Sequence, residues 1–169
     1  MNPRVWQWGA MLVALLAAGT ARGAIFADFT TSQGMFTVEL DALAAPRAVA
    51  NFLGLVDGMQ TWRDPVTGSV RGGVFGDGFY AGMKYYSTLG TVALLGGLRL
   101  YSGGDGNEYW EGPGYTILDE ATNGAALVRG VLALAAFKGP HSGGGELALV
   151  LSNVAANVGS GWTGFGAVT

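Results

Sequence analysis

The feature that most constrains the fold is a succession of short apolar runs, each interrupted by glycine, from Phe79 to the end of the chain. The runs are MKYYSTL, TVALL, LRLY, YTIL, VLALAAF, ELALVL and TGFGAV. Short runs between turn residues are typical of β-strands, whereas helices need longer periodic segments. Glycine contributes 30 of the 169 residues, without a constant repeat. The sequence therefore predicts an all-β barrel or sandwich in a single domain.

A β-hairpin is expected before these runs. Residues 25–30 and 35–40 are strand-like, and Ser32-Gln33-Gly34 joins them. Glycine suits the positive φ of such a turn. The second run alternates apolar and mostly wettable residues, which predicts one buried and one exposed face.

The spacing of residues 45–58 predicts one helix, which would cap the strands. Apolar residues recur along one helical face, at Val49, Phe52, Leu53 and Val56. Pro46 fits the first turn, and Gly58 fits the position after the last. The following stretch, 59–78, has five glycines and no sustained period, so we expect a loop or long surface excursion.

The N-terminal 23 residues have the organisation of a secretory signal peptide. Arg4 precedes the apolar run WGAMLVALLAAG, and Ala21-Arg22-Gly23 supplies small residues at a cleavage site. The apolar run is shorter than the roughly 20 residues that span a bilayer, which argues against an uncleaved anchor. We expect a signal peptide at 1–23 and a mature domain at 24–169, exported to the periplasm or outside the cell, without a membrane span after cleavage.

The charge pattern and the lack of cysteine exclude several classes of function. Removal of the signal peptide leaves seven basic residues against twelve acidic ones, and no basic run occurs. Nucleic acid is therefore not an expected partner. Without cysteine, disulfides, thiol catalysis and thiolate metal sites are excluded.

Metal binding and nucleophilic catalysis find little support in the remaining residues. The single histidine, His141, lies in a glycine-rich loop sequence, so we expect an exposed loop residue and no metal site. Residues 103–114 are acidic but lack the EF-hand pattern, which predicts a polar loop. A triad built on Ser142 and His141 would need adjacent residues to converge, and no G-x-S-x-G motif is present. The glycines of 141–146 lack the lysine of a phosphate-binding loop and predict a turn.

The order of motifs is more specific than any of them alone. Along the chain the order is Ala45-Pro46, Val49, Asn51, Phe52, Phe79-Tyr80, Gly82, Gly96-Gly97, Glu120, Arg129-Gly130, Leu134-Ala135, Ser142 to Leu149, and Phe165-Gly166. In this order of residues the chain resembles the cyclophilin-type peptidyl-prolyl isomerases over nearly all of the mature sequence. The resemblance implies a mainly β fold, a closed antiparallel eight-stranded barrel with a capping helix, whose C-terminal helix and last strand would lie beyond Thr169.

The resemblance also implies a reaction, the rotation of X-Pro peptide bonds in proline-containing polypeptides. The uncatalysed barrier is about 20 kcal/mol. An apolar pocket would hold the twisted amide while a guanidinium binds the prolyl nitrogen, and no cofactor is needed. We expect a monomer that acts on exported proteins.

The family's active positions carry unusual residues in this chain. Ser87 stands at the position of the catalytic arginine. The positions implied to bind substrate are Tyr85, Val92, Leu95, Ala135, Ala136, Glu146, Ala148 and Trp162. A serine hydroxyl cannot replace the charge-assisted hydrogen bond of arginine, so activity is expected to be weak or absent.

Three hypotheses follow. The chain is an exported prolyl isomerase, or a catalytically degraded relative that binds a peptide or serves as structure. A third alternative is a carbohydrate- or surface-binding β-domain, which would use aromatic residues such as Trp62, Tyr109 and Trp110.

Overall fold

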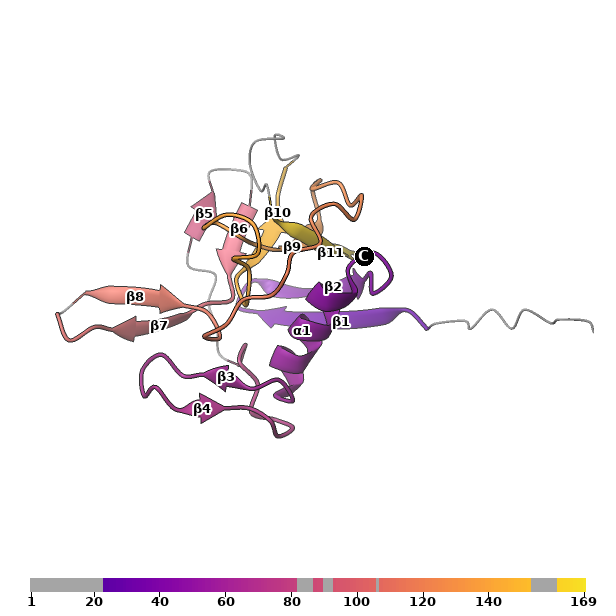
Figure 1. Ribbon diagram of the computed structural model, residues 1–169. Coiled ribbons are helices and arrows are strands. Elements are labelled where there is room, and N and C mark those ends of the chain that lie inside the picture. Colours follow the sequence, from indigo (N-terminus) through magenta and orange to yellow (C-terminus); the bar gives the residue numbers. More distant parts are fainter. Residues whose placement is uncertain (1–22, 82–86, 90–92, 106, 153–160) are drawn as a thin grey trace, which may run out of the picture.

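The computed structural model describes residues 23–169 except 82–86, 90–92, 106 and 153–160 (Figure 1). Seven antiparallel strands form one sheet in the order β1-β2-β11-β9-β10-β6-β5. In that order the strands are Ile25–Thr31, Gly34–Leu40, Thr163–Val168, Val131–Leu134, Leu147–Val150, Ala93–Gly96 and Ser87–Leu89. The predicted mainly β architecture is confirmed.

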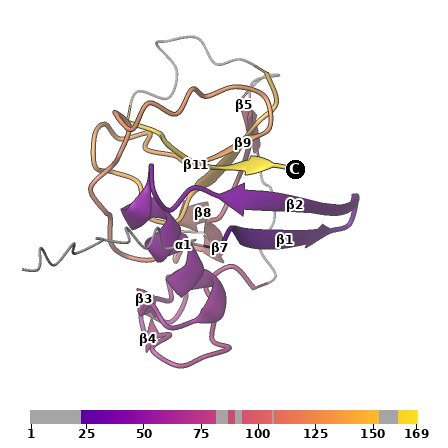
Figure 2. The same ribbon diagram turned by 90° about the vertical axis from the view of Figure 1, so that its right-hand side faces the viewer.

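The sheet curls into a half-barrel (Figures 1 and 2). Its two end strands are β1 and β5, and no ladder joins them within the described residues. The ladder of β11 and β9 shifts register between Gly164 and Gly166. Such a bulge bends a strand and increases its twist. Phe165 lies at this bend and is fully buried, so the irregularity places an aromatic ring in the core.

The predicted hairpin at the start of the sheet is present as β1 and β2. Phe29 pairs with Phe36 across the ladder, and their rings stack with centroids 4.7 Å apart. Gly34 has φ 125°, the positive value that the turn requires. Val38 and Leu40 are buried, so the expected alternation is confirmed for the end of β2.

The helix α1 spans Pro46–Asp57 and ends at Gly58, whose φ is 86°. The buried residues include Val49, Phe52 and Leu55. Val56, which the spacing placed on the apolar face, is 48% exposed. The helix therefore packs with a face rotated slightly toward Leu55, because both the sheet and the segment around Phe79 cover it.

The start of α1 is stabilised by a distant carboxylate. Ala45 precedes the helix and has no side chain that can cap it. Glu120 instead accepts hydrogen bonds from the backbone N–H groups of Arg47 and Ala48, at 3.1 and 3.0 Å from Oε2. A carboxylate here also interacts favourably with the helix dipole. Glu120 thus ties a loop to the helix.

The main core lies between α1 and the concave face of the curled sheet. Phe52 is central, with its ring centroid 5.4 Å from that of Phe165 and 5.5 Å from that of Tyr80. Val38 and Leu132 are fully buried in the same cluster. This packing fixes the helix against β2, β9 and β11.

Two small hairpins lie outside the main sheet (Figure 1). One consists of β3, Trp62–Arg63, and β4, Val70–Arg71; the other of β7, Arg99–Ser102, and β8, Glu108–Glu111.

The strand expectation was wrong for residues 115–118, which form no strand. The loop expectation was wrong for part of 103–114, which contains β8. Residues 59–78 are an excursion, as expected, but with β3 and β4 inside it. No helix in the described part of the chain is long and apolar enough to cross a membrane.

Candidate functional site

Three of the expected site positions lie in one row across the sheet. Ser87 on β5 pairs with Leu95 on β6, and Leu95 pairs with Ala148 on β10. The row continues to Ala133 on β9 and Gly164 on β11. Directly paired residues of antiparallel strands are close neighbours on the sheet. The fold therefore brings together positions that are far apart in the chain.

An apolar cluster adjoins this row and contains four of the expected binding residues: Ala135, Ala136, Ala148 and Trp162. Ala133 completes the cluster, and none of its members is more than 5% exposed. Trp162 supplies the large ring, whereas the alanines supply only methyl groups. A ring buries far more apolar area than a methyl group. The cluster is thus a packed apolar wall with a single large side chain.

Of the three remaining expected binding positions, the structure describes only Glu146. Tyr85 and Val92 lie outside the described residues. The carbonyl oxygen of Glu146 accepts a hydrogen bond from the Ala135 N–H at 2.8 Å. Glu146 therefore lies beside the apolar cluster, immediately before the strand that carries Ala148.

Phe137 is a neighbour of the cluster that the sequence analysis did not single out. Its ring meets that of Trp162 edge to face, with centroids 5.2 Å apart and an interplanar angle of 80°. Phe137 is 50% exposed, although Trp162 is 3% exposed. The residue directly follows Ala136 in the run VLALAAF, and this adjacency was the only sequence signal for it.

The glycine-rich segment at 143–145 is a tightly packed connection between β9 and β10. Asn51 of α1 donates a hydrogen bond through Nδ2 to the Gly144 carbonyl at 2.7 Å, and the Tyr115 hydroxyl donates to Asn51 Oδ1 at 2.8 Å. The Tyr80 hydroxyl donates to the Gly145 carbonyl at 3.0 Å. All three glycines, Gly143 to Gly145, are buried. The segment connects two strands, as predicted, and its packing against the helix is an additional finding.

Burial shifts the ionisation of both tyrosines that approach this segment. Burial, with a smaller contribution from Tyr115, raises the pKa of Tyr80 far above its usual value. Burial also raises the pKa of Tyr115 to about 12. Both hydroxyls therefore stay protonated at ordinary pH and act as hydrogen-bond donors, not as bases.

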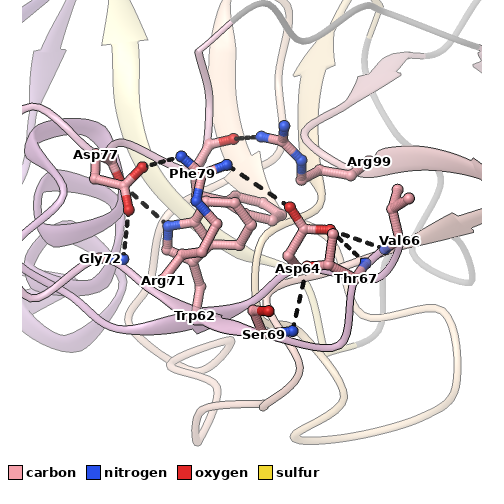
Figure 3. Close-up of polar contacts among 10 residues, drawn as sticks. All are labelled: Trp62, Asp64, Val66, Thr67, Ser69, Arg71, Gly72, Asp77, Phe79 and Arg99. Atoms are coloured by element: carbon pink, nitrogen blue, oxygen red, sulfur yellow. Dashed lines mark hydrogen bonds and ion pairs between the residues drawn. The ribbon is translucent and has the colours of Figure 1, made fainter.

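A second polar cluster surrounds Trp62, which is 2% exposed (Figure 3). The guanidinium carbons of Arg71 and Arg99 each lie 4.9 Å from the centroid of its ring. Arg99 Nη1 also donates to the Phe79 carbonyl at 2.9 Å, and Arg71 binds the carboxylate of Asp77. These contacts fasten the 59–78 excursion to Phe79 and, through Arg99, to β7. The guanidinium of Arg99 is therefore engaged here.

Two aspartates balance the arginines of this cluster. Burial raises the pKa of Asp64, but hydrogen bonds from the N–H groups of Thr67 and Val66, and the charges of Arg99 and Arg71, lower the pKa more strongly. The pKa of Asp77 is lowered, above all by the hydrogen bond from the Gly72 N–H and further by Arg71. Both carboxylates are therefore ionised at neutral pH.

The structure bears on the metal and sugar hypotheses as well. Among the described residues, no group of three or more His, Asp or Glu is placed to hold a metal ion. His141 is exposed and bonded to Asp119, whose N–H donates to Nδ1 at 3.0 Å. Burial of Trp62 removes it as a sugar-stacking residue, while Tyr109 and Trp110 belong to β8. The carbohydrate hypothesis loses one of its three aromatics.

The chain is similar to known proteins in sequence and in fold. The chain is 28% identical over 131 residues to a peptidyl-prolyl cis-trans isomerase B of Streptomyces anulatus. The match covers 78% of this chain and 69% of the relative. A crystal structure of a cyclophilin-type peptidyl-prolyl cis-trans isomerase of Cryptosporidium parvum superposes with a TM-score of 0.60, covering 86% of this chain and 78% of that chain at 19% identity. A second structure of that protein, in the presence of the dipeptide Ala-Pro, gives 0.58, also at 19% identity, and covers 84% of this chain and 77% of that chain.

A model of one protein family extends over nearly all of the domain. The family is described as cyclophilin type peptidyl-prolyl cis-trans isomerase/CLD, and the match covers residues 26–169. That range contains the helix, every candidate site residue and all of the sheet except its first residue, Ile25. The chain belongs to the cyclophilin-type peptidyl-prolyl cis-trans isomerase family.

Proposed function

We propose that the chain binds proline-containing segments of exported polypeptides beside the apolar cluster and isomerises their X-Pro bonds only weakly. The observation that carries the proposal is the row of Ser87, Leu95 and Ala148, which ends next to Trp162 and its alanine neighbours. A proline ring needs an apolar surface of this kind. The Ala-Pro dipeptide present with the Cryptosporidium parvum cyclophilin belongs to the same chemical class.

The binding half of the reaction requires little special chemistry. An apolar wall favours the twisted amide because the planar, conjugated amide is more polar and better solvated. Trp162 and the alanines form such a wall but are at most 5% exposed, so the peptide would meet it at its edge. The peptide would then pair its backbone with groups along the rim, as extended peptides do on other β-domains.

The acceleration requires an electrostatic contribution that Ser87 supplies poorly. A positioned donor to the prolyl nitrogen is needed only when conjugation is lost, so it stabilises the transition state selectively. Loss of one such donor typically costs about 3 kcal/mol, or roughly a hundredfold in rate. We therefore expect turnover well below that of family members that have arginine there.

A second candidate function is peptide binding without turnover. The contacts of Arg99 favour it, because its guanidinium is held by Trp62 and the Phe79 carbonyl and is not free to replace the missing arginine. The low exposure of Ala135, Ala136 and Trp162 leaves little apolar surface to enclose a twisted amide, which favours contact at the edge of the cluster without turnover.

The deciding experiment measures binding and turnover on the same mature chain, residues 24–169. Titration with a short Ala-Pro-containing peptide, followed by NMR, reports binding. Exchange spectroscopy on the same sample reports cis/trans interconversion against a peptide-only blank. Weak binding with slow but measurable exchange supports the first proposal. Binding with exchange equal to the blank supports the second, and no binding contradicts both.

A matched control distinguishes the proline site from non-specific contact. A peptide in which alanine replaces the proline keeps length and charge but removes the ring and the tertiary amide. Equal affinity for the two peptides would contradict a proline site even if both bind. Secretion is tested separately, by expressing the full chain in a bacterial host and determining whether the exported protein begins near Ala24.

A further inference from the structure

We propose that Phe137 is a specificity-determining residue of this site, and that its exposed face contacts an apolar side chain near the proline of the bound polypeptide. The inference rests on the proposed function and names part of its substrate preference. Phe137 lies at the rim of the apolar cluster, next to Ala136 in the chain and against Trp162 in space.

The burial pattern marks the boundary between wall and surface. Ala135 and Ala136 are at most 5% exposed, and the next residue, Phe137, is 50% exposed. A phenylalanine that shows half of its surface to water loses the favourable burial that its ring could otherwise provide. The side chain is therefore available to a ligand that lies against the cluster.

The ring of Phe137 is also held in place before any ligand arrives. Its contact with Trp162 is edge to face, at a centroid distance of 5.2 Å, which is a favourable aromatic geometry. Trp162 is itself almost fully buried. A ring that is supported on one side loses little conformational freedom when a peptide covers the other side.

The loop that presents the ring is organised by hydrogen bonds at both ends. The Ser142 hydroxyl accepts from the Lys138 N–H at 3.1 Å and donates to the Gly139 carbonyl at 2.7 Å. The His141 N–H donates to Asp119 Oδ2 at 2.8 Å, and the Asp119 N–H donates to His141 Nδ1. These contacts close the loop of residues 137–142 and anchor it to a neighbouring segment.

The exposed ring of Phe137 determines which peptide side chains bind well against it. An aromatic ring at a rim favours leucine, phenylalanine or similar side chains over alanine, and disfavours a carboxylate that would lose water there. Lys138, which follows, is exposed and stays solvated. A single supported aromatic contact corresponds to about a two- to tenfold preference in affinity.

The test uses a set of four peptides that differ at a single residue, which lies one or two positions before the proline. This residue is Phe, Leu, Ala or Glu. Dissociation constants are measured by NMR titration for the mature chain and for Phe137→Ala. The natural protein should prefer Phe and Leu to Ala by about two- to tenfold. Phe137→Ala should bind all four within about twofold while retaining the affinity for the Ala peptide.

Two further variants keep the result interpretable. Phe75→Ala removes another exposed phenylalanine, 85% exposed, from the 59–78 excursion and should leave the preference unchanged. Phe137→Leu keeps an apolar contact against Trp162 if the alanine variant unfolds, and should show an intermediate preference. An undiminished preference in a folded Phe137 variant, or no preference in the natural protein, would overturn the inference and leave the proline site intact. Failure of every proline peptide to bind would overturn the proposed function as well.

Discussion

Ser87 lies directly opposite Leu95 on the ladder between β5 and β6. Leu95 is in turn opposite Ala148, so the sheet aligns three positions at which the sequence resemblance implies active residues. Ser87 is therefore the first of these positions at which the effect of an added charge can be measured.

Ser87→Arg should raise isomerase activity by about ten- to a hundredfold over the natural chain. The substitution adds a charged donor at the position where the resemblance implies the family's catalytic arginine, and one donor of this kind contributes about 3 kcal/mol in a prepared site. The protease-coupled proline isomerisation assay measures the gain. Ser87→Lys provides the control, because it adds charge without the planar fork of arginine and should gain less. Inactivity of both variants would mean that the substitutions at Val92, Leu95 and Ala148 have removed substrate binding too.

Much of the fold could be predicted because hairpin and helix signals are local. The turn at Gly34 and the helix end at Gly58 each follow from a residue that tolerates positive φ. The buried face of α1 was predicted less well, because Leu55 is buried by the segment around Phe79. The spacing of apolar residues within the helix does not reveal this contact. The strand β8 was missed because acidic residues flank its aromatics in EYWE.

The site was accessible to sequence comparison but not to pattern alone. Ala148 and Ala135 carry no chemical signal, and only their place in the order of motifs marks them. Phe137 was missed because no periodicity distinguishes an exposed ring from a core ring at the end of an apolar run. The contact of Glu120 with α1 joins residues 72 and 73 positions apart, and no local pattern predicts such a contact.

Glu120→Ala should lower the free energy of unfolding by about 1 kcal/mol, because the N–H groups of Arg47 and Ala48 lose their acceptor and the helix dipole loses a favourable charge. Urea unfolding followed by circular dichroism measures the change. Glu120→Gln keeps an acceptor oxygen and should lose less. Glu39→Ala, at an exposed position on β2, is the control; an equal loss there would contradict a specific role of Glu120.

The cluster around Trp62 should weaken when the pH falls below the ordinary range of aspartate. The folded-state pKa values of Asp64 and Asp77 are lowered from 3.8. Their stabilising contribution is therefore complete above that value and is lost as the pH falls through the lowered folded-state values. Urea midpoints, measured by tryptophan fluorescence between about pH 5 and pH 2.5, should fall steeply at the acid end.

The variant Asp77→Asn separates this cluster from general acid effects. The amide cannot be titrated and binds Arg71 less strongly, so the variant should be less stable at neutral pH and should lose less on acidification. Asp28→Asn, at an exposed residue of β1, should retain the slope of the natural protein. Parallel curves for the natural protein and Asp77→Asn would contradict a role of Asp77 in the acid transition.

Gly144→Ala should destabilise the chain by about 1–3 kcal/mol, the usual range for overpacking a tight site. A Cβ atom at this position would lie 2.3 Å from the Tyr115 carbonyl oxygen, and this oxygen is backbone, so it cannot move as a flexible side chain can. The displaced segment would also strain the hydrogen bond from Asn51 to the Gly144 carbonyl. Gly104→Ala is the matched control, because its added Cβ meets no atom within 4 Å. Urea midpoints that shift equally in the two variants would show that the close approach at Gly144 does not limit stability.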